Sequence, residues 1–388
     1  MIKSDLVKNE FQLYGRFATE GYDWWWHSFT AINEETGEEK PFFVEYFFCN
    51  PLGEGIVKPV LGQHPDNQAV GRKPSYMMVK CGAWGDGAVQ LHRFFPWKDV
   101  TIQPKAPFSV KADDCFCTED HMYGSVDVSA EDAEAHPEWM SDAGTMSWEL
   151  EIDKCLTWNH GPVADMFRKL RGLDMCWHVE GMKTKYKGWI LFNGQKYRVE
   201  PETCYGYADK NWGSDFTTPW VWLNSNDIVS NISGKRLSNS AFVIGGGRPV
   251  AFGIPMDSHL LSCLYYEGKD YEFSFTNVTS NIKTIFDGYE TEDEVIVEVT
   301  QITRTNKMEL EARCDKKDLQ FFRYEAPSGK ARHTRLWNGG PAKANLKLYG
   351  KGAKRGDWVL IDDLALGHMG FEYGEYDKTT PYIKGEKA

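Results

Sequence analysis

CYGYADKNWGSDFTTPWVWLNSN, residues 204–226, combines large aromatic residues with acids, amides and a lysine. Surfaces usually avoid exposed tryptophan, and a buried polar group needs a hydrogen-bond partner. Neither a plain surface nor a plain core therefore accounts for this composition. Aromatic walls with a few polar groups are typical of a pocket that binds a hydrophobic molecule. We therefore expect this stretch to line a ligand site.

The composition of the 388-residue chain favours a β-protein. Aromatic residues make up 14% of the chain, with 15 tryptophans and 36 glycines. Short apolar runs separated by turn residues suit antiparallel strands. Because the chain is long for a single core, we expect two domains.

The net charge of -12 argues against a nucleic-acid partner. The apolar runs are strand-sized and too short to span a bilayer, so we predict no transmembrane segment. The N-terminus has no apolar signal-peptide region, and the nine cysteines read mainly as reduced thiols. We predict a cytoplasmic protein, and the sequence leaves a homodimer open.

Alternating patterns predict strands along most of the chain. The predicted strands cover residues 11–30, 41–50, 76–80, 89–95, 108–111, 145–157 and 176–184, followed by a hairpin over 189–199. Asn193-Gly194 predicts the turn of that hairpin. Residues 129–140 are acidic and read as a solvated loop, whereas apolar residues at helical spacing predict a helix over 161–175.

Glu45 lies in an apolar row of its predicted strand, between Phe43 and Phe47. It is either a strand-edge charge that reaches water or a buried acid with a raised pKa, which would be a useful proton donor. A second cluster at 115–121 contains cysteines, acids and a histidine, but its spacing fits no zinc pattern. We therefore predict no metal site.

Catalytic motifs that would indicate other enzyme classes are missing from the sequence. It contains no G-x-S-x-G, P-loop, H-E-x-x-H or C-x-x-C pattern. We therefore predict no cofactor, and the chain either performs acid–base chemistry or simply binds a ligand.

The segment GYADKNWG at 206–213, followed by WVWLN at 220–224, resembles the tocopherol cyclase family, which carries G-Y-x-E-K-x-W-G and then W-x-W-x-Q. Three positions depart from that pattern. Asp209 replaces a glutamate, Asn224 replaces a glutamine, and Tyr22 stands where a tryptophan is common. The first two changes shorten a polar side chain.

The resemblance implies two lipocalin-like antiparallel β-barrel or β-sandwich domains with one or two short helices, as in carotenoid 1,2-hydratases and some Diels–Alder cyclases. It places the domain boundary at the motif, which gives domains 1–216 and 217–388. It implies a cyclase, isomerase or hydratase that acts by acid catalysis on a prenyl, polyene or lipid-like substrate near the domain seam.

On this hypothesis Asp209 transfers the proton, Lys210 assists or holds it, and Glu45 is the reserve acid. Asn224, Asn226 and His178 would orient a polar head group of the substrate. The remaining predicted substrate-binding residues are aromatic: Tyr22, Trp24, Tyr46, Tyr207, Trp212, Trp220 and Trp222.

Strand alternation limits this hypothesis. Tyr207, Asp209 and Asn211 share one face of a strand, and Ala208, Lys210 and Trp212 share the other, unless a bulge intervenes near Gly213. Asp209 and Lys210 could instead form a structural ion pair. A non-catalytic carrier of a hydrophobic ligand and a partner-binding β-protein are the rival functions.

Overall fold

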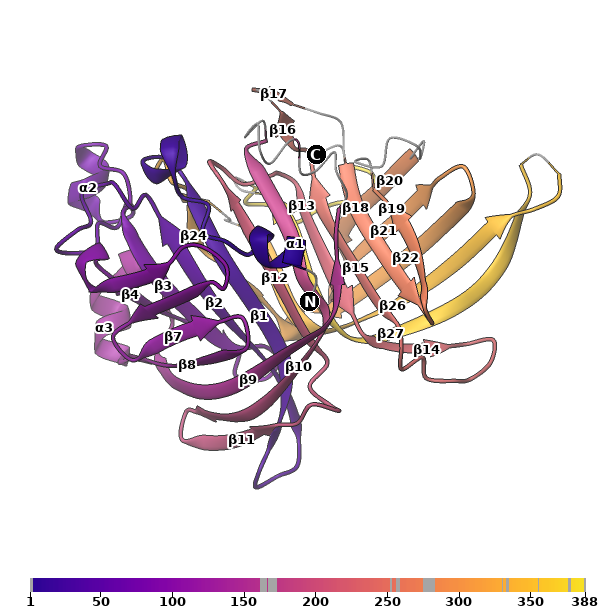
Figure 1. Cartoon of the computed structure of the whole chain (residues 1–388), viewed down its shortest axis with the longest axis horizontal. Helices are drawn as coiled ribbons and strands as arrows, with labels where there is room; N and C mark the ends of the chain where they lie inside the picture. Colours follow the sequence, from indigo (N-terminus) through magenta and orange to yellow (C-terminus); the bar gives the residue numbers. More distant parts are fainter. Residues whose placement is uncertain are drawn as a thin grey trace. The chain divides into compact units, whose positions relative to one another are not determined.

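Antiparallel strands dominate the computed structural model (Figure 1), as the alternating sequence pattern predicts. A 12-stranded sheet and an 11-stranded sheet hold most of them. The predicted mainly β class is therefore confirmed, with three short α-helices in the described part of the chain rather than one or two. The described residues are 3–160, 166, 173–251, 253–255, 259–274, 283–329, 331–332, 335–354, 356–375 and 378–386.

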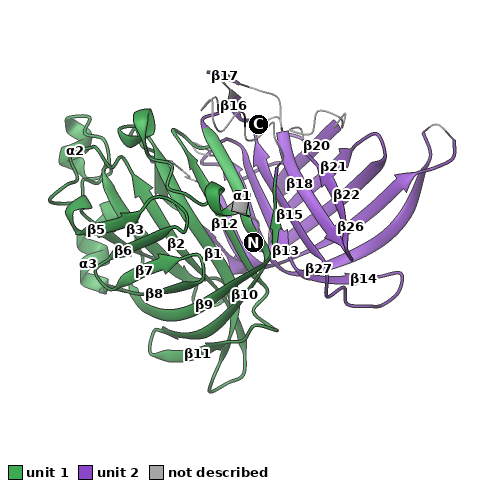
Figure 2. Ribbon diagram, viewed as in Figure 1, with its two compact units in different colours: residues 1–159, 175–216, 323–332 green, residues 160–174, 217–322, 333–388 purple. Residues whose placement is uncertain are grey.

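The chain divides into two units, which Figure 2 colours green and purple. Unit 1 comprises residues 1–159, 175–216 and 323–332, and unit 2 comprises 160–174, 217–322 and 333–388. One of the transitions lies between Phe216 and Thr217. Two short segments cross over, so neither unit is a single continuous stretch of chain, and the division into domains 1–216 and 217–388 stays a prediction.

Unit 1 contains the 12-stranded sheet and all the short α-helices described. The helices are α1 (Lys3–Lys8), α2 (Pro65–Ala69) and α3 (Ala130–Ala135), with 3-10 turns η1 (Gly15–Ala18), η2 (Trp97–Asp99) and η3 (Pro137–Trp139). The strands are β1 (Tyr22–Asn33), β2 (Glu39–Cys49), β3 (Tyr76–Ala83), β4 (Val89–Phe95), β5 (Val100–Gln103), β6 (Ser109–Ala112), β7 (Cys115–Thr118), β8 (His121–Val128), β9 (Gly144–Trp158), β10 (Met175–Phe192), β11 (Gln195–Val199) and β12 (Gly206–Gly213), with the small pair β24 (Tyr324–Glu325) and β25 (Ala331–Arg332).

The sheet of unit 1 runs in the order β4-β3-β2-β1-β11-β10-β9-β8-β7-β6-β5, and β12 pairs with both β1 and β10. It curls so that β4 packs against β8 and β9. One face therefore encloses a core of aliphatic and aromatic side chains, which includes Trp25, Phe42, Tyr46, Trp148 and Trp212. The motif strand β12 lies in the middle of this sheet, where neighbours on both sides determine its register.

Unit 2 contains the 11-stranded sheet, whose main path runs β19-β18-β15-β13-β27-β26-β22-β21-β20. Its own core includes Val221, Leu223, Phe242, Leu346 and Phe371. Its elements are β13 (Trp220–Ser225), β14 (Asp227–Ser230), β15 (Ala241–Gly247), β16 (Val250–Ala251), β17 (Ile254–Pro255), β18 (His259–Tyr266), β19 (Lys269–Phe273), β20 (Lys283–Glu290), β21 (Glu294–Ile302), β22 (Asn306–Asp315), η4 (Lys316–Asp318), β23 (Leu319–Phe321), β26 (Arg335–Lys351) and β27 (Trp358–Glu375).

Most local predictions agree with the structure, and the exceptions have physical reasons. Asn193 and Gly194 form the turn of the β10–β11 hairpin with φ values of 48° and 79°, as an Asn-Gly turn requires. Residues 11–21, predicted as strand, instead contain η1, and residues 129–140 contain α3, which the Ser129 side chain caps. The predicted helix over 161–175 lies mostly outside the described residues, and its last residue begins β10.

We expect Trp25→Ala to lower the free energy of unfolding by roughly 3–5 kcal/mol, as for a large buried aromatic. The ring is 1% exposed and stacks on Phe108 with centroids 3.8 Å apart. Trp189 on the same sheet is 37% exposed, so Trp189→Ala should cost about 1 kcal/mol or less. Urea unfolding followed by circular dichroism measures both, and equal losses would contradict this assignment of the core.

Candidate functional site

The candidate site is built on one row of residues that crosses unit 1. Trp26 of β1 pairs with Asp209 of β12 on one side and with Glu45 of β2 on the other. Glu45 in turn pairs with Lys80 of β3. Directly paired residues point to the same face of a sheet. Lys80, Glu45, Trp26 and Asp209 therefore share one face, and the two acids are two strand spacings apart, about 10 Å along the row.

Aromatic rings cover the part of this face next to the acids. We call this cluster, made of Tyr22, Trp24, Phe47, Phe216 and Tyr324, the aromatic face. Its ring centroids lie 4.6 Å apart for Tyr22 and Phe216 and 5.7 Å apart for Trp24 and Tyr324. The π-faces of such a cluster can attract a positive charge.

Glu45 is fully buried beside the aromatic face, which excludes the interpretation as a strand-edge charge. Its Oε2 accepts a hydrogen bond from the Tyr324 hydroxyl at 2.9 Å and lies 3.6 Å from the Lys80 ammonium. Burial raises the pKa of Glu45, and Lys80 and Tyr324 only partly offset this. Oε1 is buried and has no hydrogen-bond partner among the described residues.

Tyr324 reaches Glu45 from a distant part of the sequence, on the segment 323–332 that belongs to unit 1. Arg323 anchors this segment through Asp142 at 2.6 Å, and Asn50 donates a hydrogen bond to the Pro327 carbonyl at 2.8 Å. The Lys80 ammonium lies 3.2 Å from the centroid of the Tyr324 ring. These contacts hold the tyrosine against the acid. Sequence analysis missed both Tyr324 and Lys80, because no local pattern signals a contact between them.

Asp209 lies further along the same face and is 5% exposed. Its Oδ2 accepts hydrogen bonds from the Trp177 indole at 2.8 Å and from the Tyr207 hydroxyl at 2.9 Å. One residue further along the same face, Asn211 accepts a hydrogen bond from Tyr22 at 2.8 Å. The structure therefore brings together five of the predicted site residues, namely Tyr22, Trp24, Glu45, Tyr207 and Asp209.

Lys210 lies on the opposite face, so the prediction that it holds Asp209 is wrong. β12 keeps an unbroken register with β1 as far as Gly213. No bulge turns Trp212 toward Asp209, as strand alternation predicts. Lys210 instead forms a buried ion pair with Asp23, and its ammonium lies 3.2 Å from the centroid of the Trp25 ring. Burial raises the pKa of Asp23 to about 6 and lowers that of Lys210 to about 8.

Three other predicted residues, Tyr46, His178 and Trp212, also lie on this opposite face. Tyr46 donates a hydrogen bond to the Phe116 carbonyl at 2.7 Å. His178 of β10 lies directly opposite Lys210 of β12 in the strand register. Trp212 packs in the core of unit 1. Their predicted contact with a substrate would require a cavity inside this core, so the structure separates them from the acids.

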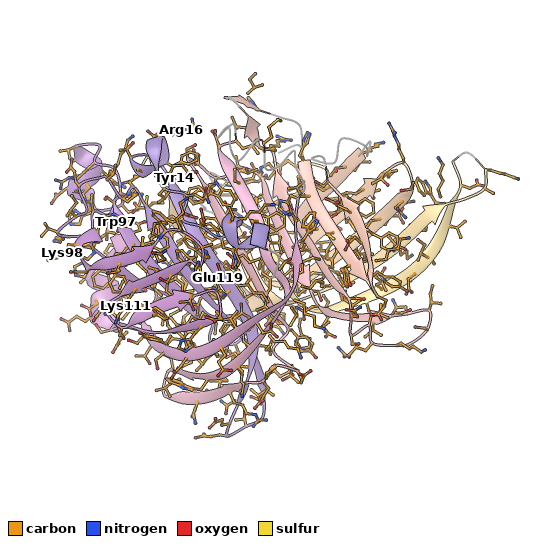
Figure 3. The ribbon with its side chains drawn as sticks, in the orientation of Figure 1. Tyr14, Arg16, Trp97, Lys98, Lys111 and Glu119 are labelled. Atoms are coloured by element: carbon orange, nitrogen blue, oxygen red, sulfur yellow. The ribbon has the colours of Figure 1, made fainter. Side chains whose placement is uncertain are left out.

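A second buried ion network on the opposite face was not foreseen from the sequence. Lys154 bridges Glu119 at 2.8 Å and Glu180 at 2.5 Å (Glu119 is labelled in Figure 3). Burial alone would lower the pKa of Lys154, but the two carboxylates outweigh it and raise that pKa. Charged residues inside apolar strands are the signal that could have indicated this network.

The remaining predicted residues, Trp220, Trp222, Asn224 and Asn226, belong to unit 2. The first three lie on β13, and the Trp220 indole donates a hydrogen bond to Glu372 of β27. Asn338 donates to the other carboxylate oxygen of Glu372 at 3.0 Å. Trp220, Trp222 and Asn224 share one face of β13, and the predicted role of all four residues in substrate binding stays a prediction.

Unit 1 also has a surface cavity of about 1070 Å³ beside β4, to which none of the predicted site residues contributes. Charged side chains, including Arg72, Arg93, Asp114 and Glu138, line much of it. Apolar side chains, including Val57, Leu61 and Trp139, line the rest, so the walls combine charged and apolar surface. In the part of the chain that the structure describes, no three His, Cys, Asp or Glu residues are grouped to hold a metal, and Cys115 and Cys117 are buried.

Known proteins are similar to parts of this chain. A family model described as "Tocopherol cyclase-like" matches residues 108–370, more than half of the chain. Two curated relatives are "Probable tocopherol cyclase, chloroplastic" of Oryza sativa subsp. japonica and "Tocopherol cyclase, chloroplastic" of Zea mays, 37% and 34% identical over 86 residues. Each match spans 22% of this chain and only 17% of the relative.

Two solved structures have a similar course of the chain at low sequence identity. An AttH-type protein of Nitrosomonas europaea is 11% identical, with a TM-score of 0.42 over 89% of this chain and 92% of that chain. CghA with Sch210972 is 12% identical, with a TM-score of 0.45 over 93% of this chain and 90% of that chain.

We expect Lys210→Met to destabilise the protein by roughly 3–5 kcal/mol, because it leaves the buried Asp23 without its partner charge. The double variant Asp23→Asn/Lys210→Met keeps an acceptor oxygen for the backbone N–H of Gln12, which donates a hydrogen bond to Asp23 at 2.7 Å. It should therefore recover more than half of the loss. Urea unfolding of the unmodified protein, Asp23→Asn, Lys210→Met and the double variant measures the coupling, and additive losses would show that the pair does not act as a unit.

Glu325, next to Tyr324 on β24, should make stability depend on pH. Burial raises its pKa from 4.5 to about 7, against hydrogen bonds from Tyr76 and Gln63. The folded protein therefore holds this proton more tightly than the unfolded chain does. The resulting stabilisation is complete below about pH 4.5 and is lost as the pH rises through about 7. The whole effect is roughly 3 kcal/mol, at 1.36 kcal/mol per pKa unit.

The matched comparison for Glu325 is Glu325→Gln, which stays neutral at every pH. We expect thermal unfolding of the two proteins to agree at about pH 4 and the variant to be the more stable at pH 8. A constant difference across this range would contradict the assignment of a buried proton to Glu325.

Proposed function

The chain belongs to the tocopherol cyclase-like family, and we propose that it is a cofactor-independent cyclase that acts by acid catalysis on an unsaturated hydrophobic substrate. The curated relatives are named tocopherol cyclases. A prenylated phenol is therefore the substrate class that we favour among prenyl, polyene and lipid-like molecules.

The observation that carries the proposal is the environment of Glu45. Its carboxyl group is buried beside the aromatic face, burial raises its pKa, and Oε1 lacks a partner among the described residues. An acid in such surroundings keeps its proton to a higher pH and can donate it to a substrate. We therefore assign proton donation to Glu45, which the sequence indicated only as the reserve acid, rather than to Asp209.

The reaction that we propose begins when Oε1 of Glu45 protonates one carbon of a substrate double bond. The other carbon becomes a cation, which the rings of Trp24 and Tyr324 stabilise by roughly 0.5–2 kcal/mol each through cation–π attraction. The phenol oxygen of the substrate then bonds to the cation and loses its proton to the Glu45 carboxylate. The sum is an isomerisation, so the acid is regenerated and no other reactant is needed.

Lys80 and Asp209 have supporting roles in this proposal. The Lys80 ammonium, 3.6 Å from Glu45, would stabilise the carboxylate that proton transfer leaves behind. Asp209, held by Trp177 and Tyr207, would place a second acidic group on the same face and stabilise the developing cation. If water attacked the cation instead of the phenol oxygen, the same residues would perform a hydration, which adds one water molecule to the product.

We expect Glu45→Gln to lower turnover of a synthetic prenylated hydroquinone at least 100-fold, as for loss of a general acid. Asp209→Asn should cost about tenfold, and Glu149→Gln, a substitution on the exposed side of β9, should have no effect. Chromatography with mass spectrometry distinguishes the cyclised isomer, which keeps the substrate mass, from a hydrated product.

Two results would overturn this assignment. Full turnover by a folded Glu45→Gln variant would exclude Glu45 as the acid, and the alternative assignment to Asp209 would be tested by the second variant in the same assay. The unmodified protein could also bind the hydroquinone without converting it and release an unchanged lipid-like molecule that co-purifies. These two results together would favour a non-catalytic carrier.

A further inference from the structure

The hairpin of β26 and β27 in unit 2 carries an exposed apolar tip. Figure 1 shows it ending in the yellow loop at the far right. Near the tip, Lys351 pairs with Trp358 and Gly350 with Val359. On its other side β27 first pairs with β14 at Leu364. Among the described residues, 358–361 therefore pair with β26 alone and leave one strand edge open.

Three consecutive apolar residues of this edge are exposed. Val359 is 60% exposed, Leu360 41% and Ile361 36%. Leu360 pairs with Tyr349 and Val359 with Gly350, so their side chains lie on opposite faces of the ribbon. Ile361 is the extra residue of a bulge between those pairs and Leu348–Asp362. Apolar side chains therefore project from both faces of the ribbon, and a single hydrophobic core cannot cover both faces.

Lysines surround this apolar tip, although the whole chain has a net charge of -12. Lys343, Lys347 and Lys351 recur on β26, and Lys354 follows in the turn; all four are exposed. None of them forms an ion pair within the part of the chain that the structure describes. Asp357 is an exposed acid at the tip, and Lys347 has Glu309 and Asp363 as its cross-strand partners. The turn itself, with Lys351 and Lys354 against Asp357, therefore carries a positive charge that can meet an anionic partner.

We propose that the tip of the β26–β27 hairpin, residues 351–354 and 356–361, docks on an anionic lipid surface. Val359, Leu360 and Ile361 insert among the lipids at the interface, and Lys347, Lys351 and Lys354 meet the negative head groups. Buried apolar area together with electrostatic attraction to anionic lipid is the combination that holds peripheral proteins on a bilayer. This proposal does not rest on the proposed function, because it concerns binding and not turnover.

The charge pattern favours a lipid surface over a second copy of the chain. Open strand edges can pair with each other, and residues 358–361 of two copies could form such a pair. That arrangement would bring two sets of lysines close together, and like charges oppose the association. An anionic bilayer instead offers negative head groups to the lysines and an apolar interior to the apolar residues at the same time.

The test uses the full chain and sedimentation with vesicles of phosphatidylcholine, alone or mixed with phosphatidylglycerol. We expect binding to the mixed vesicles that weakens as salt is added. The variant Lys347→Gln/Lys351→Gln/Lys354→Gln should bind roughly 100-fold more weakly, at about fivefold per lysine near an anionic surface. Val359→Ser/Leu360→Ser/Ile361→Ser should weaken binding more than tenfold.

The matched control is Leu52→Ser/Ile56→Ser, which removes two exposed apolar side chains from unit 1, 72% and 55% exposed. It should bind as the unmodified protein does, and thermal unfolding should confirm that all variants fold. Equal binding by the serine variant of the tip, or no binding to mixed vesicles, would overturn the proposal. Light scattering that shows dimers abolished by the same variant would assign the tip to a second copy instead.

Discussion

The site of unit 1 depends on one constraint, the continuous antiparallel register of β3, β2, β1 and β12. Successive residues of a strand point to opposite faces, so this register sorts every side chain in the four strands at once. Glu45 and Asp209 lie on one face, and Lys210 lies on the other. A slip of the register by one residue would exchange the two faces and bury different charges. The strands that pair with β12 therefore decide which of its side chains face the site, more than its own composition does.

Buried charges on the two faces of this sheet are handled differently. On one face Asp23 and Lys210 form a close ion pair, although burial raises the pKa of Asp23 to about 6 and lowers that of Lys210 to about 8. On the other face Lys80 is 3.6 Å from Glu45 and also lies over the Tyr324 ring. Burial is the larger influence on the pKa of Asp23 and on that of Glu45, and it raises both. The two acids differ in their contacts, because Oε1 of Glu45 has no hydrogen-bond partner among the described residues. The first arrangement suits structure, and the second suits proton donation.

The proposed active site and the proposed docking surface arrange their charged and apolar groups in opposite ways. The aromatic face of unit 1 gathers rings around buried acids, and these groups would act on a molecule removed from water. The hairpin tip of unit 2 exposes apolar side chains among lysines that would be costly to bury. A hydrophobic substrate partitions into lipid, so a protein that takes one from a bilayer needs both a surface that meets the bilayer and a site that excludes water.

The sequence by itself determined the β class, the Asn193-Gly194 turn and the alternation of β12, because these depend on residues close together in the chain. It also carried the family motif, GYADKNWG. Only the tertiary structure decided which charges meet: Lys210 pairs with Asp23, 187 residues away, and Tyr324 reaches Glu45 across 279 residues. It likewise divided the predicted site among two faces of unit 1 and a strand of unit 2. Alternation tells which residues share a face of one strand, but only the pairing of strands tells which faces meet.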